Sequence, residues 1–279
     1  MFYGKIFTIK SLLEHGVHYG HKKNRWNPKM AQYIYGIKNQ VHIIDLEQTA
    51  MMLDRALFAI KTVAARNGKI LFVSTKRNSF DIVEQQAKRC GQYFINKRWL
   101  GGMLSNWSTV SASVKRMEDC AALLSQDDTN FKKKERLTLQ RKYDKLSSVL
   151  GGIKTMGGLP DMLFVIDAQK HRGAIAEANR MGIEVVSVVD TNSDPTNIDH
   201  VIPGNDDARK SIEIFITLAA EAALMGMQEA LAAVNVEIDE HSDLTELRNL
   251  ATKKPFNNNN KRQGIARMKT NKKSPEAKS

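Results

Sequence analysis

The sequence predicts an α/β fold in which helices cover both faces of a mostly parallel β-sheet. Short apolar runs rich in strand-forming residues recur along the chain, and segments with helical periodicity separate several of them. Alternating strands and helices form parallel sheets, because each helix returns the chain to the start of the next strand. In the middle of the chain, two segments with heptad spacing indicate a helical hairpin inserted into this fold.

The predicted strands are five apolar runs. In the first of them Ile70, Leu71, Phe72 and Val73 follow one another without a polar residue, which is typical of a strand buried on both faces. The five runs comprise residues 69–74, 93–95, 162–166, 184–189 and 200–202.

Four further segments are predicted to be helices. Residues 46–66 have apolar side chains at positions 46, 50, 53, 57, 60 and 64, with Asp45 as a suitable N-cap and Gly68 at the end. The other three segments are residues 79–90, 172–181 and 208–231.

Residues 106–151 carry two narrow apolar seams. Their spacing of four and three residues is that of a coiled coil, and the polar stretch 125–136 joins them. The seams are Val110, Val114, Met117, Ala121 and Leu124, and then Leu139, Tyr143, Leu146 and Leu150. We expect an antiparallel helical hairpin that projects from the body, with two ordinary surface helices as the alternative.

The chain is basic, with 42 Lys and Arg against 30 Asp and Glu and a net charge of +12. A polyanionic partner is indicated: nucleic acid is the commonest, and an anionic membrane surface also fits. Residues 253–279 hold nine basic residues and a single acid, and therefore +8 of this charge. We expect this segment to be a disordered tail. Because the rest of the chain is only about +4, its binding site must be local.

Composition excludes several other classes of protein. Hydrophobic residues make up 42% of the chain, so a sizeable core can form. No stretch approaches the roughly 18 apolar residues of a transmembrane helix, and residues 1–10 lack the features of a secretory signal. Cys90 and Cys120 stand far apart, outside any CxxC motif, and we expect buried side chains in a reducing cytoplasm.

Common enzyme motifs are missing. Residues 152–158 have the glycine spacing of a P-loop, but Gly stands where the phosphate-binding Lys is required. No GxGxxG follows the first strand, and GxSxG and HExxH do not occur. We therefore expect neither an enzyme nor a cofactor, and we interpret the glycine pairs as hinges of the hairpin.

A metal ion remains an alternative at two places. His15, His18 and His21 form an HxxHxxH pattern, although the intervening glycines interrupt a helix, so contact with phosphate or base or a plain polar role competes. Two acidic clusters each follow a predicted strand, where open α/β sheets place ligands. There Asp190, Asp194 and Asp206 could hold Mg²⁺ for phosphoryl transfer, or could simply form turns. The metal candidates are His15, His18, Asp190 and Asp206.

Basic side chains interleaved with tryptophans favour RNA. Lys and Arg neutralise phosphates, Arg and Trp stack on unpaired bases, and Asn can bond to sugar or base edges. The candidate contacts are His18, His21, Lys22, Arg25, Trp26, Asn27, Lys29, Lys76, Arg77, Lys97, Arg98, Trp99, and at the hairpin tip Lys132, Lys133 and Lys134.

The segments that hold these residues resemble the universal second protein of the small ribosomal subunit, in its bacterial form. The resemblance lies in residues 12–21, 25–30, 41–44, 72–77, 98–107, 150–154, 157–161, 190–195 and 202–207, and it extends from about residue 8 to residue 230. No single segment would be specific, but together they are. His15 departs from the family pattern, in which a small residue is more usual.

The resemblance implies a doubly wound, flavodoxin-like sheet with an inserted coiled-coil hairpin. It implies a structural, non-catalytic role: binding small-subunit ribosomal RNA near the junction of head and body, and helping to recruit the large messenger-binding ribosomal protein. The protein would be cytoplasmic and ribosome-bound, with an organelle as an alternative, and without a membrane partner. The competing hypotheses are a Mg²⁺-dependent phosphoryl-transfer enzyme and a basic peripheral surface protein.

We expect four parts. Residues 1–105 and 151–235 form the α/β RNA-binding body, residues 106–150 the hairpin, residues 236–252 a short helical extension, and residues 253–279 the disordered basic tail.

Overall fold

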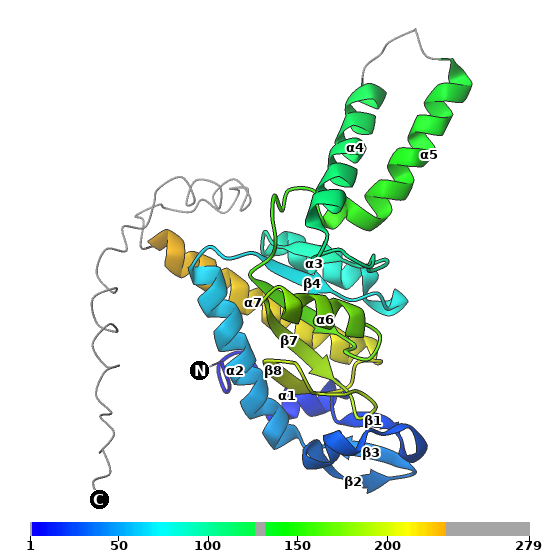
Figure 1. Cartoon of the computed structure of the whole chain (residues 1–279). Helices are drawn as coiled ribbons and strands as arrows, with labels where there is room; N and C mark the ends of the chain where they lie inside the picture. Colours follow the sequence, from blue (N-terminus) through cyan, green and yellow to red (C-terminus); the bar gives the residue numbers. More distant parts are fainter. Residues whose placement is uncertain (1, 126–131, 233–279) are drawn as a thin grey trace, which may run out of the picture.

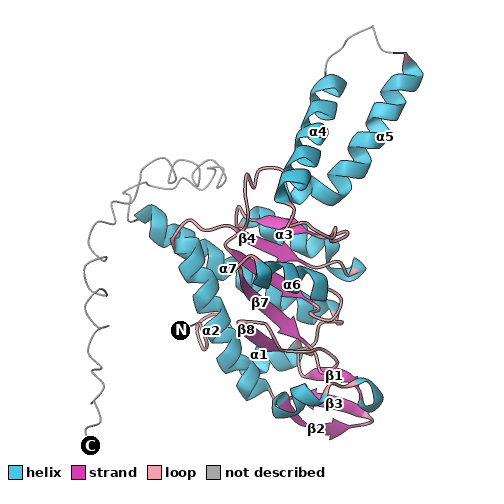
Figure 2. Cartoon of the chain, in the orientation of Figure 1, coloured by secondary structure: helices cyan, strands magenta, loops and turns pink. Residues whose placement is uncertain are grey.

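The computed structural model describes residues 2–125 and 132–232, and its core is a five-stranded parallel sheet (Figures 1 and 2). The strands are β4 (Ile70–Val73), β5 (Tyr93–Ile95), β6 (Met162–Ile166), β7 (Glu184–Val189) and β8 (His200–Pro203). They lie in the order β5-β4-β6-β7-β8. Counted along the chain this is 2-1-3-4-5, the flavodoxin-like order, so the predicted fold class and all five predicted strands are confirmed.

Helices cover both faces of the sheet. Strand residues alternate between two buried clusters, and in β6 Phe164 belongs to one whereas Leu163 and Val165 belong to the other. The first cluster includes residues of α1 (Ile9–Glu14), α2 (Leu46–Ala65), α3 (Phe80–Arg89) and α7 (Arg209–Ala232), and the second includes residues of α6 (Arg172–Arg180) and of the hairpin. The four helices predicted from periodicity are therefore present and bury the face that the pattern indicated.

Helix α7 packs closely on α2. A Cβ atom at Gly226 would lie 2.3 Å from the carbonyl oxygen of Lys61, so only glycine allows this approach. By length and composition α7 could cross a membrane, yet 61% of its most apolar stretch is buried within the protein. Its apolar residues are thus accounted for by the core.

The predicted hairpin consists of α4 (Trp107–Ser125) and α5 (Lys133–Leu150), which pack against each other and project from the body (Figure 1). Val110, Val114 and Met117 of the α4 seam are buried, and the residues around them are largely exposed. Where the chain returns, a Cβ atom at Gly152 would lie 2.1 Å from the carbonyl oxygen of Phe94 in β5. This glycine therefore seats the base of the hairpin against the sheet.

A small antiparallel sheet was not predicted. It consists of β1 (Tyr19–Lys22), β3 (Val41–Ile44) and β2 (Ile34–Lys38), in the order β1-β3-β2. Asn39 and Gln40, both with positive φ, make the tight turn between β2 and β3. These strands are short and mostly half-exposed, so they lack the apolar runs that identify buried strands.

Short 3₁₀ turns complete the body: η1 (Lys23–Arg25), η2 (Pro28–Tyr33), η3 (Arg77–Ser79) and η4 (Gly151–Ile153). Cys90 and Cys120 are buried, as expected. The predicted helical extension 236–252 and basic tail 253–279 lie outside the described residues.

Candidate nucleic-acid interface

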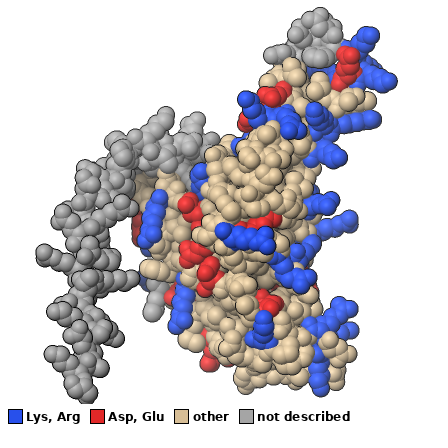
Figure 3. Space-filling view, in the orientation of Figure 1, with Lys and Arg blue, Asp and Glu red and all other residues tan. Residues whose placement is uncertain are grey.

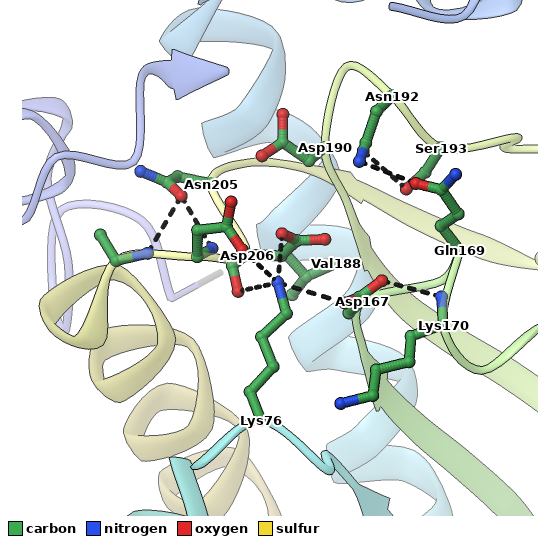
Figure 4. Close-up of polar contacts among 12 residues, drawn as sticks. Lys76, Asp167, Gln169, Lys170, Val188, Asp190, Asn192, Ser193, Asn205 and Asp206 are labelled. Atoms are coloured by element: carbon green, nitrogen blue, oxygen red, sulfur yellow. Dashed lines mark hydrogen bonds and ion pairs between the residues drawn. The ribbon is translucent and has the colours of Figure 1, made fainter. Parts of the chain in front are cut away.

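The carboxyl edge of the parallel sheet gathers charged side chains from four loops. In this topology ligands bind at the switch point between the first and third strands, here β4 and β6. Lys76 follows β4 and Asp167 follows β6, and Lys76 Nζ lies 3.2 Å from Asp167 Oδ2. The same ammonium lies 2.7 Å from Asp206 Oδ1 in the loop after β8 (Figure 4). It also lies 2.6 Å from Oδ1 of Asp207, the next residue in that loop. A cation therefore already fills the switch point.

Burial and charge act against each other in this cluster. Burial disfavours the ammonium, but the carboxylates, chiefly Asp206, outweigh it and hold the pKa of Lys76 well above its usual value. Burial, and then the charge of Asp190, raise the pKa of Asp206 to about 7, with Lys76 opposing the rise. Within the described residues Asp206 Oδ2 is buried without a hydrogen-bond partner, as suits a carboxyl that holds a proton readily.

His21 joins the small sheet to the same edge. Its Nδ1 lies 2.9 Å from Asp190 Oδ2 and its Nε2 lies 3.3 Å from Asp207 Oδ2. The hydrogen bond with Asp190 raises the pKa of His21 against the effect of burial. The backbone N–H of His21 also donates to Thr191 Oγ1 at 2.8 Å. A Cβ atom at Gly20 would lie 2.6 Å from Thr191 Cγ2, so this contact requires glycine at position 20.

Within the described residues, one group of side chains could hold a divalent cation: ligand atoms of His21, Asp190 and Asp207 lie within 4.8 Å of one another. Of the metal candidates from the sequence, Asp190 is in this group, whereas Asp206 lies beside it and pairs with Lys76. His15 and His18 do not belong to it. His15 Nδ1 lies 2.7 Å from the carbonyl oxygen of Ser11, and the His18 ring packs against the Tyr19 ring with 4.0 Å between centroids.

The carboxylates proposed for phosphoryl transfer have separate partners. Asp194 Oδ2 accepts a hydrogen bond from Lys29 Nζ at 2.7 Å, and this bond, together with hydrogen bonds from Thr196, lowers the pKa of Asp194 to about 2. Asp190 binds His21 and Asp206 binds Lys76. One oxygen of each carboxylate is therefore already paired with a side chain of the protein, which does not favour that hypothesis.

The first run of basic and aromatic residues is divided between acidic partners and solvent: His21 contacts Asp190 and Lys29 contacts Asp194. Lys22 and Arg25 are exposed, on β1 and η1. Trp26 is 40% exposed, and its ring centroid lies 5.2 Å from that of His42. Asn27 is turned inward: its side chain accepts from the backbone N–H of Lys29 and caps η2. Lys22, Arg25 and Trp26 thus present two cations and an aromatic face to solvent.

The basic run after β5, residues 97–99, also has some side chains exposed to solvent and one bonded within the protein. Lys97 and Arg98 are exposed, with Lys97 Nζ lying 4.3 Å from the centroid of the Phe80 ring. Trp99 donates from Nε1 to Glu177 Oε1 at 3.2 Å. Trp99 therefore anchors its loop to α6.

Glu177 organises the path from the sheet to the hairpin. Its carboxylate accepts backbone N–H bonds from Gly102 and Leu104, each at 2.9 Å, in addition to the bond from Trp99. Burial opposes ionisation of Glu177, but these donors hold its pKa below the usual value.

Arg77 and the hairpin residues Lys132, Lys133 and Lys134 are exposed as well. Figure 3 shows Lys and Arg side chains along the hairpin arm and along the adjacent edge of the body, with acidic side chains closer to the middle of that face. Sequence reasoning missed the role of His21 as the partner of Asp190 and Asp207. In the sequence His21 only precedes a basic run, and its partners lie far away in the chain, so no local signal pointed to them.

The sequence of this chain is similar to those of ribosomal proteins. The family model described as "Ribosomal protein S2" matches residues 12–226. The chain is 54% identical over 233 residues to the "Small ribosomal subunit protein uS2" of Bradyrhizobium sp. (strain BTAi1 / ATCC BAA-1182), covering 83% of this chain and 71% of that relative. It is 52% identical over 227 residues to the protein of the same name from Granulibacter bethesdensis, covering 81% and 88%. The family match spans most of the described body and the hairpin, and the chain belongs to the ribosomal protein S2 family.

Proposed function

We propose that this chain is a structural constituent of the small ribosomal subunit that binds the ribosomal RNA of that subunit during translation. The observation that carries the proposal is the family match over residues 12–226 together with relatives that are small-subunit proteins. The geometry adds exposed cations and an exposed tryptophan beside an edge of the sheet whose own charges are paired.

The exposed side chains are the proposed RNA contacts. Lys22, Arg25 and Trp26 form one group, Arg77, Lys97 and Arg98 lie on the body, and Lys132, Lys133 and Lys134 lie on the hairpin. Guanidinium and ammonium groups neutralise phosphates, and Trp26 can stack on an unpaired base. The other candidates, His18, His21, Asn27, Lys29, Lys76 and Trp99, act in this proposal by positioning the loops that carry those contacts.

Each predicted part of the chain has its own role in this proposal. The body of residues 1–105 and 151–235 presents cations to RNA, and the hairpin of residues 106–150 extends that contact. Neighbouring small-subunit proteins are further partners in this proposal. One proposed partner is the large messenger-binding ribosomal protein. The chain then acts in the cytoplasm on the ribosome as a scaffold, without catalysing a reaction.

Sedimentation of a tagged form of this protein from gently lysed cells tests the proposal. Because phosphate contacts release counterions, the protein should sediment with small subunits and translating ribosomes at low salt and dissociate at high salt. Protein that stays at the top of the gradient at low salt would overturn the assignment.

A further inference from the structure

A groove of about 560 Å³ lies where the end of α7 meets α2 and the N-terminal segment. It is lined by Phe2, Lys5, Ile6, Phe58, Lys61, Met225, Gln228, Glu229 and Ala232. None of the proposed RNA contacts is among these residues, so the groove is separate from the proposed interface.

The groove is preformed and exposes apolar surface. Asp54 of α2 accepts hydrogen bonds from the backbone N–H groups of Phe2 and Tyr3, which hold the N-terminal segment in place. Lys61 Nζ lies 2.5 Å from Glu229 Oε1 and ties α2 to α7. Phe58 is nevertheless 61% exposed and Met225 is 36% exposed. Covering such side chains is favourable because it removes apolar surface from water.

The chain leaves α7 at this groove. Ala232, the last residue of the helix, is itself part of the lining, and residues 233–279 follow it. Residues 233–243 span roughly 35 Å when extended, which is ample to turn back along the end of α7. A segment tethered in this way competes at an effective concentration of about millimolar.

The chemistry of the next residues complements the groove. Leu244, Leu247 and Ala251 have the spacing of one helical face and could cover Phe58 and Met225. Acidic side chains outnumber basic ones in residues 236–252. The one basic residue there is Arg248, and the acidic residues are Glu237, Asp239, Glu240, Asp243 and Glu246. In the groove Lys61 is already paired with Glu229, whereas within residues 2–125 and 132–232 Lys5 takes part in no ion pair, so Lys5 is the cation that the groove offers to an acidic side chain.

We propose that residues 236–252 fold back and dock in this groove, with Leu244 and Leu247 against Phe58 and Met225 and with the acidic side chains toward Lys5. The docked segment covers the apolar surface that α2 and α7 leave open. It also fixes the point from which the basic residues 253–279 extend, at the α2–α7 end of the body. This inference does not depend on the proposed RNA contacts.

Oxidation of methionine by hydrogen peroxide in the full chain tests it, because the reaction follows exposure of the thioether. Met225 lies in the groove, and Met51, 58% exposed on α2 and absent from the groove lining, is an internal reference. The test variant is Leu244→Asp/Leu247→Asp. The matched control, Ile265→Asp/Met268→Asp, makes the same change with the same spacing in residues 253–279.

We expect the test variant to raise the oxidation rate of Met225 by about fivefold or more relative to Met51, since the rate scales with the undocked fraction. The control variant should leave the ratio unchanged at every protein concentration. An unchanged Met225 rate in the test variant would overturn the proposal. So would protection that grows with protein concentration, which indicates a second copy, or protection found only on small subunits, which indicates a neighbouring ribosomal component.

Discussion

Lys76 Nζ lies 2.7 Å from Asp206 Oδ1, and this contact joins the loop after β4 to the loop after β8. The side chain of Asp206 is 2% exposed and that of Lys76 is 15% exposed, so water screens the pair weakly. The two strands are not neighbours in the sheet, and the ion pair bridges the carboxyl ends of the strands between them.

Replacing Lys76 with Met should destabilise the protein by about 3 kcal/mol, because buried carboxylates lose their counter-charge. Urea unfolding at neutral pH measures the change. The control is Lys22→Met, which removes an exposed cation. A loss for Lys76→Met as small as that of the control would contradict a structural role.

Asp206 gives stability a pH dependence of known sign. Its pKa rises from 3.8 to about 7 on folding, so the folded state binds more protons than the unfolded state between these values. The contribution of this carboxyl to stability therefore falls as pH rises from about 4 to about 7. We expect the stability of the wild type relative to Asp206→Asn to decrease over that range, measured by urea unfolding at a series of pH values. A flat difference would show that Asp206 is ionised throughout.

Gly20 and Gly36 form a matched pair of strand glycines. A Cβ atom at Gly20 would lie 2.6 Å from Thr191 Cγ2, whereas one at Gly36 would have no neighbour within 4 Å. Gly20→Ala should thus lower the free energy of unfolding by about 1–3 kcal/mol through overpacking, and Gly36→Ala should leave it nearly unchanged. Thermal unfolding of both variants tests the docking of the small sheet on the loop after β7. Equal midpoints would mean that the two sheets separate easily.

Glu177 should control the order of the loop that leads to the hairpin. In Glu177→Gln an amide N–H₂ group replaces one acceptor oxygen that faces backbone N–H donors, and we expect a loss of about 2 kcal/mol. Hydrogen exchange at the amides of Gly102 and Leu104 should accelerate. Glu221→Gln, which affects the exposed ion pair with Arg89, serves as the control and should leave these amides unchanged. If the amides of Gly102 and Leu104 still exchange slowly in Glu177→Gln, the loop is held in place by packing and not by this carboxylate.

Arg25→Ala and Arg98→Ala should each weaken incorporation into small subunits. If each guanidinium contacts one phosphate of a duplex, the slope of the logarithm of the binding constant against the logarithm of the salt concentration should become shallower by about 0.9 in each variant. Competition between tagged variant and wild type during subunit assembly measures the effect, with Arg55→Ala on exposed α2 surface as the control. Incorporation equal to that of the wild type would remove these two residues from the proposed interface.

Much of the fold could be predicted because burial leaves a mark on local sequence. The runs at β4 and β6 are apolar throughout since both faces of each strand are covered, and helix α2 buries a single apolar stripe. The strands β1, β2 and β3 escaped notice because they are short and half-exposed. These strands are held in place by contacts with a distant loop, for example that of His21 with Asp190.

The site was only partly predictable for the same reason. Basic residues near tryptophans could be found by composition, but Lys76 and Arg77 are adjacent in sequence and have opposite environments: Lys76 is enclosed by three carboxylates and Arg77 is exposed. Likewise Asp190 and Asp194 share one cluster in sequence and bind different partners.

The sequence by itself determined the α/β class, the hairpin and the family, because hydrophobic period and contiguous motifs are local properties of the chain. Only the tertiary structure decided which charges face inward. Asp206 meets Lys76 across 130 positions of the chain and His21 meets Asp190 across 169, and such pairings depend on how loops converge at the edge of the sheet. Whether a cation is free to meet a phosphate is set by that convergence, since a carboxylate a few ångströms away neutralises it first.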